Sequence, residues 1–337
     1  MAQVREIIDG DGHIYERDDE IQPYLDSRFH YDGLRNFPFF PTLDGWHRGS
    51  FSAQFGVNPP PHPDASDWLK FLDENEISET VIYPTAGLGS GFIKDKVWYT
   101  ELSRGYNNFV HDRYLKASPR LKAVALIPVV DPQAAAQELR RAVKELGMVG
   151  GLLPAIGLRR PYGDAAFDVL FKEAEDLGTM LAVHGAPQQG LGFDFFETFF
   201  PGFVLEHPLS IMIQFTSMIT ERVFERFPDL KVAYLEASCG WAPYLMERID
   251  QRFKGIATKQ VQNSPIYFHA ELKDADVLNS VISILGDDRL TYASDYPHEQ
   301  ADEIAEDLEH FLAREDLSQT SKERILRDNS KALYAMR

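Results

Sequence analysis

Short apolar segments alternate with longer amphipathic ones along most of the chain. Several of the apolar segments are continuous rather than alternating, which is typical of parallel strands covered on both faces. They predict eight strands, over residues 5–9, 79–84, 121–130, 149–154, 179–184, 230–236, 266–269 and 290–294. Segments with helical spacing of apolar residues lie between them, at 132–146, 165–177, 243–253 and 302–314.

This alternation favours a single (β/α)8 TIM barrel over residues 1–337, with long loop insertions over the C-terminal face of the barrel. A doubly wound open sheet is the alternative, but no predicted strand is followed by a Gly-x-Gly-x-x-Gly turn. The segment 27–67 is rich in Pro, Gly and aromatic residues and has no sustained period. Long loops in compact domains are usually functional, so we expect this insertion to cover the barrel and aim Phe39, Phe40 and Trp46 into a pocket.

The composition narrows the class of protein. The chain has 34 Lys and Arg against 52 Asp and Glu, which gives a formal net charge of −18. The negative electrostatic field of such a protein repels the phosphate backbone of nucleic acid. The single cysteine, Cys239, excludes a disulfide framework and a Cys-rich metal cluster. No apolar run has the length of a signal peptide or a membrane span. We expect a cytoplasmic protein with no nucleic-acid or membrane partner.

Polar residues stand at the ends of four predicted strands. Asp11 and His13 follow the first strand in the sequence DGDGH, and in an extended chain two side chains at this spacing point the same way. His184 ends the fifth strand, Glu236 ends the sixth and Asp295 follows the eighth. Residues at the C-terminal ends of barrel strands build active sites, so these five side chains are the predicted metal ligands.

Carboxylates and imidazoles suit several divalent ions, with zinc our first expectation and manganese or iron as alternatives. Such an ion is a Lewis acid and lowers the pKa of bound water to about 7. Asp295 would then be a ligand or the base that takes a proton from this water. Glu236 would bind the same ion, bridge to a second or act as a general acid. His298 is expected to hydrogen-bond Asp295 or substrate, and Glu16 either orients His13 or is exposed.

Nearly the whole chain resembles the amidohydrolase-2 branch of the amidohydrolase superfamily. The resemblance is carried, in order, by the segments IIDGDGHIYE, AVHG, FPDLKVAYLEASCGWAPYLMERID, YASDYPH and KERILRDNSKALYAM. This branch includes decarboxylases of aminocarboxymuconate semialdehyde and of hydroxylated benzoates, so the resemblance implies a metal-dependent barrel, with homodimers common. Glu236 stands where those decarboxylases commonly have a histidine, and the fourth strand has no lysine for a carbamylated bridge.

The resemblance and the candidate ligands together favour a hydrolase or lyase. The substrate would be a planar or hydrophobic small molecule with a carbonyl or carboxylate group, since the covering segment is aromatic. One alternative is a dinuclear iron oxygenase, which some members of this branch in natural-product pathways resemble. The other alternative is a catalytically inactive barrel with a binding role, which an absence of bound metal would support.

Overall fold

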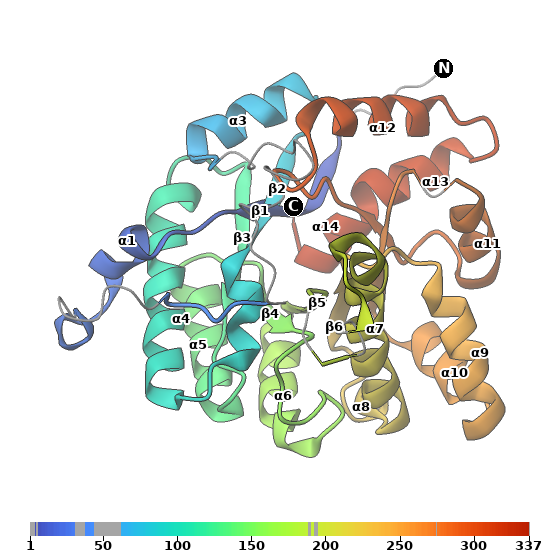
Figure 1. The fold of residues 1–337 in the computed structure, drawn as a ribbon. Coiled ribbons are helices and arrows are strands. Elements are labelled where there is room, and N and C mark those ends of the chain that lie inside the picture. The colour runs from blue at the N-terminus through green and yellow to red at the C-terminus, as the bar shows by residue number, and fades with distance from the viewer. Residues whose placement is uncertain are drawn as a thin grey trace.

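Eight parallel strands form the centre of the molecule (Figure 1), in a computed structural model that describes residues 4, 6–30, 38–43, 62–187, 190–191, 195–273 and 275–336. Each strand pairs with its sequence neighbour, in the order β1 to β8. They are β1 (Ile8–Ile14), β2 (Glu79–Pro84), β3 (Leu121–Leu126), β4 (Gly150–Pro154), β5 (Met180–His184), β6 (Lys231–Leu235), β7 (Ile266–Ala270) and β8 (Leu290–Tyr292). The predicted TIM barrel is confirmed, and this sequential order excludes a doubly wound sheet.

Helices surround the strands. They are α1 (Asp18–Ile21), α3 (Ala65–Glu74), α4 (Lys96–Val110), α5 (Pro132–Glu145), α6 (Asp168–Leu177), α7 (Phe199–Thr220), α8 (Val223–Arg226), α9 (Trp241–Phe253), α10 (Ile256–Asn263), α11 (Ala275–Leu285), α12 (Ala301–Ala313), α13 (Gln319–Glu323) and α14 (Asn329–Tyr334). Because helices cover the outer face and side chains fill the interior, β5 is buried along its whole length. No helix in the described part of the chain is long and apolar enough to cross a membrane.

The barrel closes where β8 meets β1. The backbone N–H of Asp295 donates to the carbonyl of Asp11 at 2.9 Å, and that of His13 donates to the carbonyl of Tyr296 at 2.7 Å. Below them the buried Asp9 carboxylate accepts the backbone N–H and the hydroxyl of Ser294, at 2.8 and 2.9 Å. These bonds hold the first and last strands together at the end of the barrel that carries the candidate ligands.

Local sequence signals explain most element boundaries. Asp131 caps α5 by accepting the N–H of Ala134, and Pro132 occupies the first helical position, where no N–H is needed. β3 ends at Leu126, earlier than expected, because Pro128 has no N–H for a ladder. β1 begins and ends later than expected, at Ile8 and Ile14, so the expectation that it stops at residue 9 is wrong.

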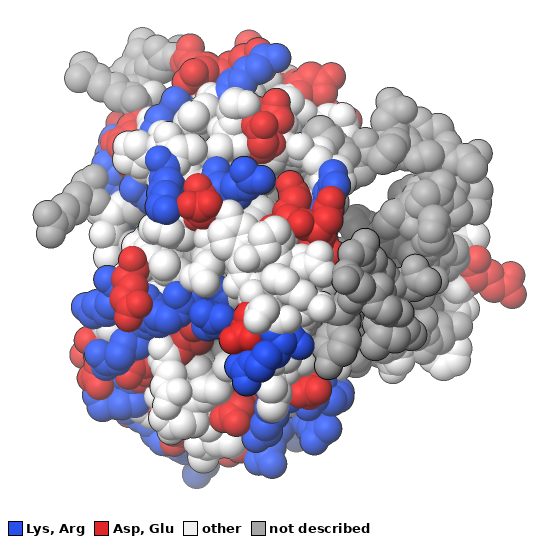
Figure 2. All heavy atoms as spheres, turned by 90° about the vertical axis from the view of Figure 1, so that its left-hand side faces the viewer, with Lys and Arg blue, Asp and Glu red and all other residues white. Residues whose placement is uncertain are grey.

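The predicted covering insertion is described only in part, since residues 31–37 and 44–61, with Trp46, lie outside the described residues. Phe40 is buried in the hydrophobic core, and Phe39 packs edge-on against Trp98 of α4 with ring centroids 5.2 Å apart. Figure 2 shows one face of the molecule, on which Lys and Arg are interspersed with Asp and Glu instead of gathering by sign. That face presents no continuous basic patch among its described residues.

Candidate metal centre

The first two candidate ligands lie within β1. The strand runs through the DGDGH sequence, which corrects the expectation that this motif follows the strand. Glycine is required there because neighbours come close: a Cβ on Gly12 would lie 2.3 Å from the Trp68 ring, and one on Gly10 would lie 2.9 Å from the carbonyl oxygen of Tyr292. A shift in the β1–β2 register falls within the same stretch. The glycines therefore allow tight packing beneath Asp11 and His13.

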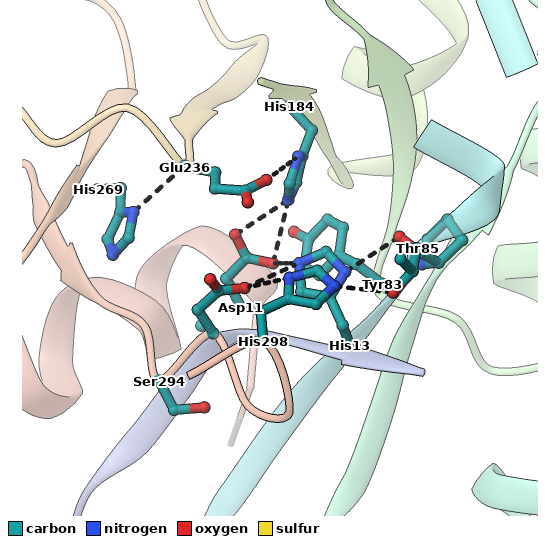
Figure 3. Close-up of polar contacts among 12 residues, drawn as sticks. Asp11, His13, Tyr83, Thr85, His184, Glu236, His269, Ser294 and His298 are labelled. Carbon is teal, nitrogen blue, oxygen red and sulfur yellow. Dashed lines mark hydrogen bonds and ion pairs between the residues drawn. The ribbon is translucent and has the colours of Figure 1, made fainter. Parts of the chain in front are cut away.

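Asp11, His13 and His184 converge at one end of the barrel (Figure 3), where Asp295 adjoins His13. Nε2 of His184 lies 3.1 Å from Oδ2 of Asp11, and Nε2 of His13 lies 3.4 Å from Oδ1 of Asp11. The same His13 nitrogen is 3.5 Å from Oδ1 of Asp295. Donor atoms about 2.1 Å from one tetrahedral ion are about 3.4 Å apart. The donor atoms of Asp11, His13 and His184 therefore have a spacing that fits a single metal ion, and Asp295 adjoins this set through His13.

The hydrogen bonds of His13 point its free nitrogen at this site. Nδ1 of His13 lies 3.0 Å from the carbonyl oxygen of Pro84, which can only accept, so Nδ1 carries the proton. Nε2 is then an unprotonated acceptor, buried and without a hydrogen-bond donor among the described residues. Burial, followed by the charge of His298, lowers the pKa of His13 to about 3. A lone pair that faces two carboxylates needs a cation between them, so the residues fit a divalent ion.

His184 and Glu236 form the second part of the site. Nδ1 of His184 lies 2.8 Å from the carbonyl oxygen of Gly185 and 3.1 Å from Oε2 of Glu236. Burial alone would lower the pKa of His184, but Asp11 and Glu236 outweigh it and raise that pKa to about 9. Burial and the nearby Asp295 charge raise the pKa of Glu236 well above its ordinary value. Glu236 therefore lies behind His184, beside the ring nitrogen that does not face Asp11.

His298 lies next to Asp295, as predicted. Its Nδ1 is 2.8 Å from Oδ1 of Asp295, and its Nε2 is 3.0 Å from the hydroxyl of Thr85 at the end of β2. Its ring stacks on His13 with centroids 4.3 Å apart. Burial would raise the pKa of Asp295, but His298, His13 and His184 together hold it well below its usual range. Asp295 therefore remains ionised, which suits a metal ligand.

Two groups of three side chains have ligand atoms close enough to hold an ion. They are Asp11, His13 and His184, and His13, Asp295 and His298. Both groups use the same Nε2 lone pair of His13, since its Nδ1 is bonded to Pro84. One lone pair binds one ion, so His13 can be a ligand in only one of the two groups at a time.

The backbone at Glu236 and Asp295 has left-handed geometry, with φ of 58° and 55°. Residues other than glycine seldom adopt this conformation, and it is concentrated at functional sites. At the end of a strand it turns the chain sharply, so that the side chain is presented to the end of the barrel. The two candidate catalytic carboxylates share this feature.

Sequence reasoning did not assign three residues correctly or fully. Glu16 neither orients His13 nor is exposed: its two carboxylate oxygens accept the N–H groups of Gly87 and Thr85 at 2.6 and 3.0 Å. His207 of α7 is buried, with Nε2 3.5 Å from Oε1 of Glu236. His269, at the end of β7, accepts the backbone N–H of Glu236.

A cavity of about 540 Å³ opens beside these side chains. Its wall includes Glu236, His269, Ser294 and Asp295, together with Lys273 at its rim. Lys273 is paired with Glu299 at 3.4 Å. The cavity has room for a small molecule in contact with Asp295, the candidate ligand that lines it.

Known proteins are similar to this chain over most of its length. The 2-amino-3-carboxymuconate-6-semialdehyde decarboxylase of Dictyostelium discoideum is 23% identical over 239 residues, which cover 68% of this chain and 65% of that protein, just under two thirds of its length. The gamma-resorcylate decarboxylase of a Polaromonas species is 25% identical over 292 residues, covering 80% of this chain and 86% of that one.

The fold is also found in solved structures. One is a dihydroxybenzoic acid decarboxylase from Polaromonas with bound manganese and the inhibitor 2-nitroresorcinol, which superposes with a TM-score of 0.70 at 17% identity over 98% of this chain and 97% of that one. A family model described as amidohydrolase matches residues 8–336. The chain therefore belongs to the amidohydrolase family of enzymes.

Proposed function

We propose that the protein is a metal-dependent decarboxylase of a planar, carboxylated small molecule. The observation that carries the proposal is the convergence of Asp11, His13, His184 and Asp295 around the unpartnered Nε2 of His13. The names of the relatives support the reaction type, since both curated relatives described above are decarboxylases.

These four side chains would hold the ion. Two carboxylates and two imidazoles accept manganese and zinc alike, and the manganese in the Polaromonas structure makes manganese the first ion to test. The ion would act as a Lewis acid that withdraws charge from a bound carboxylate or phenolate. Glu236 is not among the proposed ligands, because its carboxylate contacts the opposite nitrogen of His184.

Decarboxylation needs a proton donor, and Glu236 is placed to be one. The bond between the ring carbon and the carboxylate breaks, its electron pair stays on the ring carbon, and carbon dioxide leaves. That carbon must then take a proton. Glu236 lines the cavity, and burial and the charge of Asp295 raise its pKa, which favours its protonated form, the form that a proton donor needs. The proton that Glu236 gives up would be replaced from solvent through the cavity that it lines.

Hydrolysis by a metal-bound water needs a base, and Asp295 is the candidate. Its depressed pKa makes it a weak one, which favours decarboxylation over hydrolysis. A dinuclear iron oxygenase would need two ions, whereas the two donor groups share a single lone pair on His13.

The test combines metal analysis with product analysis. Protein purified without chelator is assayed for metal content, then reconstituted with manganese or zinc and incubated with 2,6-dihydroxybenzoate and related hydroxybenzoates. We expect one ion per chain and release of one carbon dioxide per molecule consumed. Two irons per chain would support the oxygenase instead, and consumption of an ester or amide without carbon dioxide would support the hydrolase. Protein that binds no metal would indicate an inactive barrel.

A further inference from the structure

His269 lies on the wall of the cavity but has no role in the reaction proposed above. It is the last residue but one of β7 and is buried, and its ring stands beside Glu236 (Figure 3). The same cavity wall includes Glu236 and Asp295, which belong to the proposed reaction site. His269 is therefore close to where a substrate would lie.

The backbone fixes which nitrogen of His269 carries the proton. The N–H of Glu236 donates to Nδ1 at 3.2 Å. A ring nitrogen that accepts a hydrogen bond has no proton, so in the neutral ring the proton is on Nε2. The left-handed backbone of Glu236, with φ of 58°, belongs to the turn that presents this N–H.

The Nε2–H group of His269 is buried and has no hydrogen-bond partner within the described ranges. Buried donors are rarely left unpaired in native proteins, because an unpaired one is costly. The missing partner must be an acceptor. A metal ion cannot take its place, since Nε2 already carries the proton as long as Nδ1 accepts from Glu236.

We propose that the Nε2–H of His269 donates a hydrogen bond to an oxygen of the substrate, and so selects molecules with a carbonyl, hydroxyl or carboxylate oxygen on the β7 side of the cavity. This inference rests on the proposed function, because it assumes that one end of the substrate binds the metal ion. It adds a second anchoring point, supplied by a strand that contributes no proposed metal ligand. Such a site discriminates against an analogue without the oxygen, which would leave the donor unpaired.

The tautomer can be tested without any substrate. Nitrogen-15 NMR of the histidine-labelled protein should show a neutral His269 with its proton on Nε2, identified by loss of the signal in His269→Leu. A proton on Nδ1 would overturn the proposal, because Nε2 would then be an acceptor.

Binding is tested with two inert probes on the manganese-loaded protein, measured by calorimetry. 2-Nitroresorcinol has two hydroxyl groups beside the nitro group, and 2-nitrophenol has one. If one hydroxyl and the nitro group occupy the metal end, the second hydroxyl oxygen is available to His269. We expect His269→Leu to weaken the binding of 2-nitroresorcinol about 2- to 10-fold, which is the effect of one neutral hydrogen bond. The same substitution should weaken the binding of 2-nitrophenol less than 2-fold. His269→Gln, whose amide offers an N–H at a similar reach, should restore part of the difference.

The outcomes separate this inference from the proposed function. Equal weakening of both probes in His269→Leu, or loss of manganese from that variant, would overturn the role of His269 and leave the proposed function standing. If wild-type protein with full metal content binds neither probe and releases no carbon dioxide, the proposed function fails, and this inference fails with it.

Discussion

Nδ1 of His298 is hydrogen-bonded to Oδ1 of Asp295 at 2.8 Å, and Nε2 of the same ring is hydrogen-bonded to the Thr85 hydroxyl at 3.0 Å. The two bonds fix the ring between β2 and the loop after β8, and the ring stacks on His13. His298 thus positions a proposed metal ligand from behind. The roles of Asp295 and Glu236 can therefore be distinguished by experiment, because Asp295 is bonded to His298 and Glu236 contacts His184.

The proposed ligands are tested first by metal content. Asp11→Ala, His13→Ala and His184→Ala should each lower bound metal at least 10-fold and abolish activity, because a truncated ligand leaves an open coordination position. The barrel should stay folded, since a chain of this size is stabilised mainly by apolar burial. Elemental analysis and far-ultraviolet circular dichroism provide the two measurements. His310→Ala is the matched control, because His310 is exposed on α12. Full metal occupancy in the three variants would show that the ligand set is wrong.

Replacement of Asp295 by asparagine separates charge from coordination. Asparagine keeps an oxygen donor but removes the negative charge beside the ion, so we expect a substantial fraction of the metal to remain while kcat falls about 10²- to 10³-fold, the usual loss when one electrostatic group is removed from an active site. Metal content and kcat are measured on the same preparation. An active, metal-replete Asp295→Asn enzyme would show that the charge at this position is dispensable.

His298→Asn should have a milder effect on kcat and shift the pH profile. His298 is one of the groups that lower the pKa of Asp295, so without it that pKa rises and the acid limb of the activity profile moves to higher pH. Thr85→Val removes the second hydrogen-bond partner of His298. It should move the acid limb of the activity profile in the same direction as His298→Asn, but by a smaller amount. A profile unchanged in both variants would contradict the positioning role.

Glu236→Gln tests the proton donor. Glutamine has nearly the same size and can still line the cavity, but it has no proton to give, so kcat should fall about 10²- to 10⁴-fold with metal content unchanged. Glu236→Asp retains the acid and should recover part of the rate. Loss of metal in Glu236→Gln would instead make Glu236 a ligand.

Glu16 should make stability depend on pH. Burial raises its pKa from 4.5 to about 7 in the folded protein, so the folded state binds this proton more tightly than the unfolded state does. The resulting stabilisation is complete below pH 4.5 and is lost as pH rises through about 7, on the order of 3 kcal/mol in all.

Urea unfolding of the wild type and of Glu16→Gln, between pH 4.5 and 8, measures this contribution. The wild type minus variant difference in unfolding free energy should fall as pH rises. A difference that rises with pH would mean that the backbone N–H bonds from Thr85 and Gly87 outweigh burial and keep Glu16 ionised.

The fold could be predicted because strand and helix signals agree along the chain. β2 has the predicted bounds, Glu79–Pro84, because its apolar run is closed by a proline and flanked by polar residues. β1 was misplaced because Gly10 and Gly12 are typical of a turn. Their role inside the strand depends on Trp68 and Tyr292, which lie far away in sequence.

The four proposed ligands were identified from strand ends, where position alone favours a site. Glu16 and His269 could not be assigned in this way. The environment of Glu16 is set by backbone groups of Thr85 and Gly87. The protonation of His269 is set by the backbone of another strand. Neither partner has a signature in the local sequence.

The hydrogen bonds that join β1 to the end of β8 have a consequence for how the protein is synthesised on the ribosome. Asp9 and Ser294, which these bonds join, are 285 residues apart, and a ribosome adding about 5–20 residues each second takes about 15–60 s to make that stretch. Throughout this interval Asp11 and His13 have been synthesised but Asp295 has not. The four proposed ligands are therefore all present only after the last strand is translated, so under this proposal metal uptake would report that translation had reached the final strand.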